Sequence, residues 1–563
     1  MNIESFIWGI CDDVLRDHFK RHECGDIILP FLVLRRLDCV LEERKDEIVK
    51  QYNEFKEHDD PADIIHTKLK INFSNYSKYD LKRLTNEPSK LSENLFEYLK
   101  SFSPNVLEII ENFKLDKWIE DLEKNEILYQ LIEKFSEVDL HPSKVDNHTM
   151  GSIFEELLRK FSEMSNETSG EHYTPRDIVD LLVSLVFAPE TDNLSTPNKI
   201  VSLYDPCCGT GGMLTIGKKW IHENISKDIE VNMFGQELNG QTYAICKSDF
   251  LITDEQPENI KQFSTLSKDG FKDTNRGFDY MICNPPYGVS WKNDKKFVVN
   301  ESKDPNGRFS VGTPRVSDGQ LLFLQHMISK MEPSGSRIGV VFNGSPMFTG
   351  DSGSGESEIR KWIIENDWLE TIVQLPDRMF FNTGITTYLW IVTNKKSPNR
   401  KGKIQLIDGS SFYSHIKKNL GDKSKEINDI DKNKILKTYQ ECEENEISKI
   451  FENDHFCYTR VQVEQPLKKN GEIVKLKNGK PKPDTKLRDH ERIPLNISIE
   501  KYFEEEVKPH LPHSWMDRSK DIIGYEINFV KEFFKYKKLK DLNIVLSELE
   551  NLNETIESEF KNL

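Results

Sequence analysis

The stretch FDYMICNPPYG, residues 278–288, places an amide and an aromatic ring directly after an apolar run. Asn284 is followed by Pro285, Pro286 and Tyr287, and proline cannot donate to a strand ladder, so a strand must end here. The prolines hold the Asn284 side-chain oxygen and the Pro285 carbonyl in fixed positions. Two such acceptors beside an aromatic ring suit a flat group that carries an amino group on its edge.

Acceptors in this arrangement can activate a weak amine. The amino nitrogen of adenine is a poor nucleophile because its lone pair is delocalised into the ring. Acceptors at its hydrogens, from Asn284 and Pro285, stabilise the positive charge that grows as the nitrogen attacks a methyl group. Tyr287 offers a face on which a base stacks, and a base in a duplex must first be flipped out. The plainer alternative is a Pro-Pro turn that ends a strand.

A glycine-rich turn, YDPCCGTGG at residues 204–212, follows one predicted strand and opens a helix. It lacks the Lys-Ser/Thr of a P-loop and the GxGxxG spacing. Its glycines allow positive φ and close approach of a ligand to the backbone. The alternative is an ordinary tight connection. The candidate ligand-binding residues of this turn are Asp205, Gly209, Thr210, Gly211 and Gly212.

The next predicted strand, VNMFGQE at residues 231–237, ends in Glu237. In a doubly wound fold, an acid at the end of the second strand can accept hydrogen bonds from both ribose hydroxyls. An acid also occurs there by chance, so Glu237 alone is weak support. The turn, the acid and Asn284 each end a successive strand, and this combination predicts one ligand-binding crevice.

The elements that must position these residues alternate between short β-rich runs and helical runs. This predicts a parallel sheet covered by helices, a doubly wound α/β domain. Its last two strands, LETIVQLP and TTYLWIVTN, have no helix between them, which suggests an antiparallel edge. We expect a helical N-terminal domain at 1–150, a Rossmann-like α/β domain at 151–400, a polar extension at 401–540 and a C-terminal helix at 541–563.

Several polar segments interrupt or follow this pattern. Gly288–Gly319 and residues 344–358 are expected to be loops without regular structure, and the first could close over a flipped base. Residues 468–492 hold nine Lys or Arg against four Asp or Glu, which more often marks a solvated loop than a nucleic-acid site. The apolar residues of the last helix lie at a/d spacing: Leu542, Val545, Leu549, Leu552 and Ile556.

Composition bounds the class of protein. With 563 residues the chain should form two to four domains. A net charge of −17 counts against a chain that grips nucleic acid alone. No apolar run approaches the roughly 18 residues of a membrane span, and nine scattered cysteines predict a cytoplasmic protein with reduced thiols. Cys207 and Cys208 are adjacent, a poor spacing for zinc, so we expect no metal.

DPCCGTGG followed by NPPY resembles the motif pair of amino-group DNA methyltransferases that use S-adenosylmethionine, in the gamma-type order. The likeness covers nearly the whole chain and is close to the modification subunit of type I restriction-modification systems. FIWGICDDVLRDHFKRHECGDIILPFLVLRRLD resembles the helical N-terminal domain of that family, and MGSIFEELLRKFSEMSNETSGEHYTPRDIVDLL resembles its entry into the methylase domain. The resemblance implies site-specific methylation of the 6-amino group of adenine in double-stranded DNA.

The resemblance also assigns residues. Tyr173, Thr174 and Pro175 match the segment that contacts the methionine part of the cofactor, the glycine turn and Glu237 match the cofactor site, and NPPY is the catalytic motif. Two positions depart from the family. Ser264, within QFSTL, stands where an Asp usually reads the cofactor's adenine amino group, and Asp249 stands where an Asn is usual.

The partners that the resemblance implies are a specificity subunit, a restriction subunit and DNA, with two modification subunits per specificity subunit and no membrane. The C-terminal helix could then bind the specificity subunit, or instead pack on its own chain. Two other functions remain open at this point. Some enzymes with NPPY methylate glutamine amides in proteins, and a scaffold without activity would fit the loss of the acid at Ser264.

Overall fold

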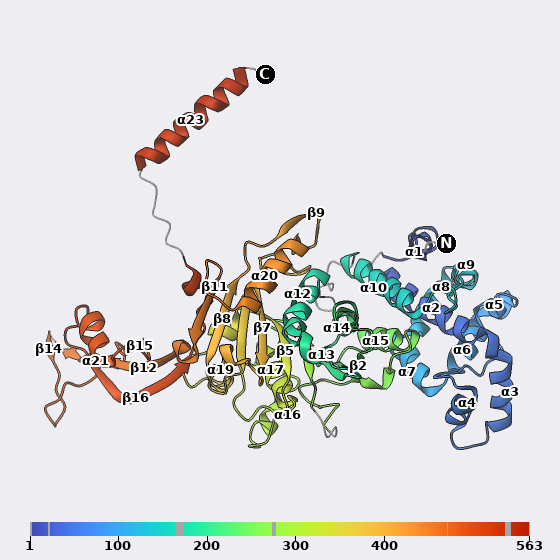
Figure 1. The fold of residues 1–563 in the computed structure, drawn as a ribbon, viewed down its shortest axis with the longest axis horizontal. Helices are drawn as coiled ribbons and strands as arrows, with labels where there is room; N and C mark the ends of the chain where they lie inside the picture. Colours follow the sequence, from blue (N-terminus) through green and yellow to red (C-terminus); the bar gives the residue numbers. More distant parts are fainter. Residues whose placement is uncertain are drawn as a thin grey trace. The chain divides into compact units, whose positions relative to one another are not determined.

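The computed structural model describes residues 3–20, 23–164, 174–272, 277–469, 471–534 and 542–561. The chain divides into two compact units, Met1–Glu526 and Ile527–Leu563. The first unit contains an N-terminal helical region, a large central sheet and a smaller C-terminal sheet (Figure 1).

The N-terminal region is helical, as predicted. Its helices are α1 Ile3–Ile10, α2 Glu23–Leu41, α3 Lys45–Phe55, α4 Pro61–Leu69, α5 Leu81–Leu84, α6 Leu91–Lys100, α7 Pro104–Phe113, α8 Leu115–Lys124, α9 Leu128–Glu137 and α10 Asn147–Met164. Helix α2 is buried on almost every side. Its buried Arg36 donates to the carbonyl oxygens of Leu140 and Val145, so the charge is satisfied inside the bundle.

The central sheet is mixed. Its strands are β1 Ile200–Asp205, β2 Glu230–Glu237, β3 Ile260–Gln262, β4 Tyr280–Cys283, β5 Arg337–Asn343, β6 Leu369–Gln374, β7 Thr387–Thr393, β8 Lys403–Asp408 and β11 Ser448–Glu452. Their order across the sheet is β11-β8-β6-β7-β5-β4-β1-β2-β3. The five strands β3, β2, β1, β4 and β5 are parallel to one another. The strand order reverses at β1, which creates the crevice expected of a doubly wound fold.

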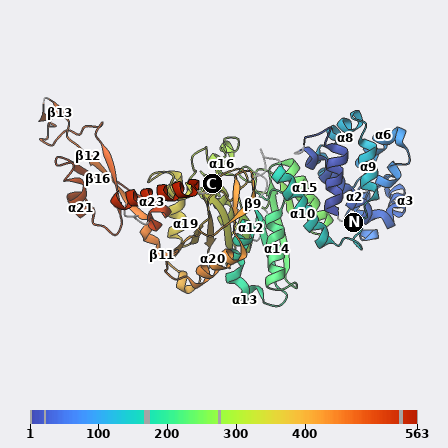
Figure 2. The same cartoon turned by 90° about the horizontal axis from the view of Figure 1, so that it is seen from above.

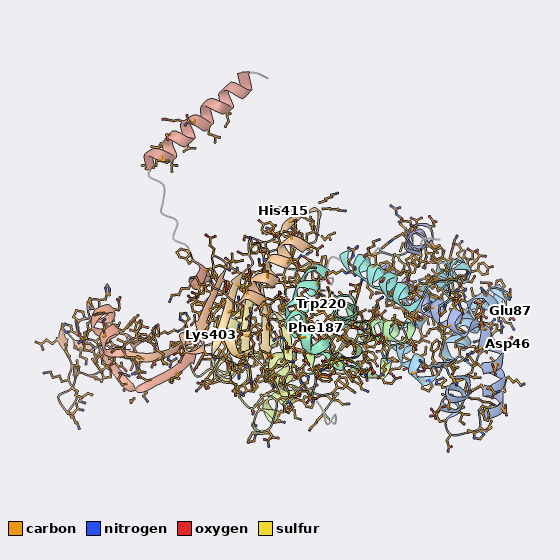
Figure 3. The ribbon with its side chains drawn as sticks, in the orientation of Figure 1. Asp46, Glu87, Phe187, Trp220, Lys403 and His415 are labelled. Atoms are coloured by element: carbon orange, nitrogen blue, oxygen red, sulfur yellow. The ribbon has the colours of Figure 1, made fainter. Side chains whose placement is uncertain are left out.

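Helices cover both faces of this sheet (Figures 1 and 2). On one face lie α12 Arg176–Phe187, α14 Gly212–Asn224 and α20 Asp429–Glu441, and on the other α17 Gln320–Ser329 and α19 Gly355–Glu365. Phe187 of α12 and Trp220 of α14 stack with ring centroids 5.8 Å apart, which fixes the angle at which α14 leaves the glycine turn (Figure 3).

Helix α15, Gly240–Ile252, joins the helical region to the sheet. One side of it, including Tyr243 and Cys246, lies in the core of the sheet, and the opposite side, including Ile245, lies in the helical core. The buried Lys247 of α15 forms an ion pair with the partly exposed Glu108 of α7, with 2.5 Å between nitrogen and oxygen. The helical region is therefore packed directly against the part of the sheet that carries Glu237.

The two segments predicted as loops contain helices. Gly288–Gly319 includes α16 Lys295–Glu301, and its Trp291, Val298 and Phe309 form a small core with Leu266 and Leu322. Residues 344–358 include α18 Ser345–Phe348 and the start of α19. Both predictions of structureless loops were wrong, because polar composition hid a few well-spaced apolar anchors.

The predicted antiparallel pairing of the strands LETIVQLP and TTYLWIVTN is confirmed, but their predicted position at the edge of the sheet is wrong. Strands β6 and β7 are antiparallel, yet they lie inside the sheet, because β8 pairs parallel to β6 and β11 continues beyond β8. The sheet thus extends past residue 400, where the polar extension was expected to begin. The domain limits predicted from composition remain a proposal.

A three-stranded sheet follows, in the order β15-β12-β16. The remaining elements of this extension are β9 Ser414–Leu420, β10 Lys423–Glu426, β12 Cys457–Glu464, β13 Lys468–Lys469, β14 Glu472–Ile473, β15 Asp489–Pro494, α21 Ile499–Tyr502 and β16 Trp515–Tyr525. A short helix, α13 Thr191–Leu194, precedes β1, and the second unit holds α22 Phe529–Phe533 and α23 Leu542–Lys561. Among the described helices, none combines the length and apolarity needed to cross a membrane.

Candidate active site

The glycine turn connects β1 to α14 and is held from both sides. The Cys208 N–H donates to the Gln236 carbonyl at 3.0 Å, so the turn is pinned to the end of β2. Gly209 and Gly211 have φ values of 54° and 86°. A Cβ at Gly211 would also lie 2.8 Å from the Cys246 sulfur, so only glycine fits. The prediction of positive φ is confirmed for these two residues and wrong for Gly212, the first residue of α14.

Space for a ligand lies beside this turn. A Cβ placed on Gly212 would meet no atom within 4 Å. Thr210, half-buried, stands between the two left-handed glycines. The N-terminal N–H groups of α14 have no side-chain cap, so they remain available to a ligand carboxylate.

Glu237 ends β2, as predicted, and faces the glycine turn. Its carboxylate accepts from the Gly209 N–H at 2.9 Å and from the Asn239 N–H at 2.7 Å. Each oxygen keeps a further lone pair, so the group can still accept from two hydroxyls. The acid and the turn predicted from separate motifs are thus in direct contact.

Asp205 is buried at the end of β1, with 1% of its surface exposed. Burial, aided by the negative charge of Glu237, raises the pKa of its carboxyl to about 7, against hydrogen bonds from the Cys207 backbone and the Cys207 and Cys283 thiols. The carboxylate therefore costs free energy to ionise and would be stabilised by a cationic ligand.

Asp205, Cys207 and Cys283 are the one group of three possible metal ligands found in the described part of the chain. The two sulfurs lie 3.1 Å apart. Burial raises the pKa of Cys283 to about 11, and the hydrogen bond with Cys283 together with burial raises that of Cys207. Both thiols are therefore protonated at neutral pH, and a metal ion would have to displace their protons to bind.

Asn284 follows β4 directly, next to the end of β1 in the sheet. Its amide nitrogen donates to the Thr174 hydroxyl at 2.9 Å. Pro285 is buried and Pro286 exposed, so the turn is anchored on one side and open on the other. The structure brings together Thr174, Pro175 at the start of α12 and Asn284; Tyr173 lies outside the described residues.

Tyr287 is partly buried and contacts both Asn284 and Phe380. Its hydroxyl donates to the Asn284 side-chain oxygen, and its ring lies edge-on to Phe380, with centroids 5.9 Å apart. Burial raises the pKa of this hydroxyl well above its usual value, so it stays a donor. The acceptor proposed for the target amine therefore already accepts from the tyrosine that was expected to stack on the base.

Ser264, which stands where the family usually has an Asp, contacts an acid from another segment that the sequence did not reveal. The Ser264 hydroxyl donates to the carboxylate of Asp294 at 2.9 Å. Asp294 precedes α16, 30 residues further along the chain. Two apolar side chains that directly follow β2 and β3 are also exposed, Leu238 at 67% and Phe263 at 36%. Asp249, the second departure, is buried in α15.

A buried network supports the segment after Asn284. Arg308 donates to His326 at 3.0 Å, and the other ring nitrogen of His326 lies 2.9 Å from the Tyr204 hydroxyl. Burial and the charge of Arg308 lower the pKa of His326 well below its usual value, so the ring is neutral. Arg308 also pairs with Glu301 of α16. Nothing in the spacing of these residues signals that they meet.

Comparisons with known proteins decide the family. A model of the N-6 DNA methylase family matches residues 145–473. The chain belongs to the N-6 DNA methylase family. A model of the HsdM N-terminal domain matches residues 3–135. As a member of this family the protein is an adenine-specific DNA methyltransferase, a type I modification subunit, and neither a glutamine methyltransferase nor an inactive scaffold is favoured.

Individual relatives agree with the family. The chain is 26% identical over 446 residues to the type I restriction enzyme MjaIX methylase subunit of Methanocaldococcus jannaschii, covering 73% of each. It is 29% identical to the HindI methylase subunit of Haemophilus influenzae, over 46% of this chain and 54% of that one. The methyltransferase subunit from Streptococcus thermophilus shares the fold, with a TM-score of 0.63, 22% identity, and coverage of 80% of this chain and 96% of that one.

Proposed function

We propose that this N-6 DNA methylase binds S-adenosylmethionine in the crevice between the glycine turn and Glu237. The residues that would hold it are Tyr173, Thr174, Pro175, Asp205, Gly209, Thr210, Gly211, Gly212 and Glu237. The residues fit the group: a buried carboxyl that gains from a cation, open space beside Gly212 and a carboxylate placed for ribose hydroxyls. When bound, the cofactor supplies the methyl group as a sulfonium.

Asn284 and the Pro285 carbonyl accept the hydrogens of the target amine in this proposal. The observation that carries it is the position of Asn284 beside Thr174, at the end of a strand adjacent to the glycine turn. The Thr174 hydroxyl accepts from the amide nitrogen and so directs the side-chain oxygen toward the site. Fixed acceptors are worth more than mobile ones because they need no reorganisation as charge develops.

In this proposal the Tyr287 ring stacks on the base while its hydroxyl can keep its hydrogen bond to Asn284. The Asn284 side-chain oxygen has a second lone pair, which can accept from the target amine. Pro286, exposed beside it, borders the same opening. The resting contact keeps the Asn284 side chain oriented in the absence of DNA.

Asp294 is the group that we assign to the cofactor's adenine amino group. Its carboxylate is held by Ser264 at the carboxyl edge of β3, at the position where the acid was missing from the sequence. Leu238 and Phe263 follow the paired residues Glu237 and Gln262 of β2 and β3, so these exposed apolar side chains can flank a planar ring.

The proposed partners are a specificity subunit, a restriction subunit and DNA, with two modification subunits per specificity subunit. The net charge of −17 gives an unfavourable long-range field for a polyanion. We expect this chain alone neither to bind DNA tightly nor to methylate one defined sequence. All nine cysteines are free thiols, which suits a cytoplasmic location.

The test is co-expression of this chain with the specificity subunit that we expect it to bind. Plasmid DNA from these cells should carry N6-methyladenine at one sequence, and plasmid from cells with the chain alone should not. Calorimetry on the purified chain should show cofactor binding without DNA. Cofactor binding without any DNA methylation in the complex would reject the assignment of the reaction, whereas the absence of both would reject the cofactor site.

A further inference from the structure

A basic β-ribbon projects from the C-terminal sheet, between β12 and β15. We call residues 466–469 and 471–487 the basic arm. Strands β13 and β14 pair antiparallel within it, Lys468 with Ile473 and Lys469 with Glu472. Figure 1 shows the arm at the end of the long strands β12 and β16. The family assignment and the crevice give this segment no role.

The arm is ordered by its backbone. The Leu467 N–H donates to the Lys482 carbonyl, the Lys482 N–H to Val474 and the Leu476 N–H to Lys480, each at 2.8 Å. It has no apolar core of its own, and Leu476 remains 42% exposed. A ribbon of this size gains little from burial, so its shape is maintained by hydrogen bonds that leave the side chains free.

Seven lysines cover the arm, against two acids, Glu472 and Asp484. All seven side chains are exposed, and none forms an ion pair with any residue that the structure describes. Some cations elsewhere in the extension are paired, as Arg488 is with Glu464. The lysines are Lys468, Lys469, Lys475, Lys477, Lys480, Lys482 and Lys486.

The pairing places cations on both faces of the ribbon. Lys468 and Lys469 are neighbours in β13, so their side chains lie on opposite faces of the ribbon. Lys475 bridges to Pro481 and shares its face, whereas Lys482, the next residue after Pro481, lies on the other. A single charged face would suit an acidic patch on a protein. Charge on two faces suits a groove with phosphates on both walls, and the major groove of DNA admits a two-stranded ribbon.

We propose that the basic arm binds the phosphate backbone of duplex DNA beside the methylation target. Lysines act as point charges toward phosphates and carry no sequence information. The arm would supply the electrostatic grip that the acidic chain otherwise lacks, while the specificity subunit selects the site. This rests on the DNA substrate of the family and on the proposed partner.

The test compares two seven-fold variants in the complex of the full chain with its specificity subunit. In one, all seven lysines become Gln; in the other, all become Arg, which keeps the charge. Binding to a duplex with the target is measured against salt concentration. Each lost phosphate contact lowers the slope of log affinity against log salt by about 0.9. We expect the Gln variant to lose about three to five units of slope, and at least about tenfold in affinity at 0.1 M salt.

The Arg variant should retain slope and affinity. The ratio of affinities for target and non-target duplexes should be unchanged in the Gln variant, because the lost contacts are to phosphate. Methyl transfer at saturating DNA should also persist, which separates this proposal from a failure of the catalytic site. A Gln variant with the slope of the unaltered complex would overturn the proposal. So would a Gln variant that no longer co-purifies with the specificity subunit, since the arm would then be a protein interface.

Discussion

The carboxyl edge of the central sheet and the C-terminal part of the chain differ in how they satisfy their polar groups. At the sheet edge, Asp205, Glu237 and Asn284 are each held by hydrogen bonds from neighbouring strands or turns. In the basic arm and in α23, lysines and apolar side chains are exposed, among them Leu549 at 51% and Leu552 at 58%. On our proposal, the groups for the chemistry are preorganised within this chain, whereas the exposed surfaces are completed by partners.

The difference has a physical reason. Catalytic groups must be fixed before the substrate arrives, because a small displacement of an acceptor costs rate. Surfaces that assemble gain their free energy only on contact, so they stay exposed in the free chain. The variants below separate groups that act within this chain from surfaces that need a partner, beginning with the largest expected effect.

Asn284→Ala should reduce methyl transfer by about a hundredfold or more, because it removes an acceptor aimed at the developing charge. Single-turnover transfer to DNA measures this, and calorimetry should show unchanged cofactor affinity. Asn284→Asp is the comparison variant, since it keeps an acceptor oxygen while it replaces the donor to Thr174 with a second, negatively charged acceptor. Methylation by Asn284→Ala at the wild-type rate would disprove the mechanism.

Deleting residues 541–563 should abolish co-purification with the specificity subunit and leave cofactor binding intact. The apolar side chains of α23 are exposed, including Leu542 at 72% and Ile556 at 45%, as a partner-binding helix requires. Pull-down of the tagged specificity subunit is the measurement. Leu549→Asp should weaken capture, while Ser547→Asp, also exposed on α23, should not. Assembly of the truncated chain would show that partner binding lies elsewhere.

Glu237→Ala should weaken cofactor binding by about ten- to a hundredfold, because two ribose hydroxyls lose a charged acceptor and Gly209 loses its partner. The dissociation constant is measured by calorimetry on the chain alone. Glu230→Ala, at the exposed opposite end of β2, is the control and should bind normally. Equal constants for Glu237→Ala and the wild type would remove Glu237 from the site.

The sequence was enough to predict strands β1, β2, β4, β5, β6 and β7 and the residues at the ends of the first three, because period, glycines and prolines are local signals. It did not predict β3, β8 or β11. It did not reveal Asp294 beside Ser264, nor Arg308 against His326, because these contacts join segments that are 30 and 18 residues apart in the chain. It also did not reveal that the Tyr287 hydroxyl donates to the Asn284 side-chain oxygen. Motifs predict which groups are present, but only packing shows which groups bind one another before the ligand arrives.

Cofactor affinity should depend on pH through Asp205. In the free protein its pKa is raised to about 7 by burial, with Glu237 adding to the shift and the thiols of Cys207 and Cys283 opposing it. A cationic ligand favours the ionised form, so affinity should be constant above about pH 7 and fall as the pH drops below it. Because only one proton is exchanged on binding, the affinity can fall by at most about tenfold per pH unit. Calorimetry from about pH 5.5 to about pH 8.5, a range that brackets the shifted pKa, should show this change in cofactor affinity. The affinity of the Asp205→Asn variant should not change with pH over this range.

The smallest expected effect concerns the hydrogen bond that the Tyr287 hydroxyl donates to the Asn284 side-chain oxygen. Tyr287→Phe removes the hydrogen bond but keeps the ring, so base stacking survives and the acceptor oxygen is freed. We expect a change in the rate of transfer of less than about threefold, since one hydrogen bond of this kind has a small net free energy. Tyr287→Ala should instead weaken productive DNA binding, because stacking is worth about 1–3 kcal/mol per base. If Tyr287→Phe were as impaired as Tyr287→Ala, the hydroxyl would act in the reaction itself. The preorganised edge would then include the tyrosine as well as the asparagine.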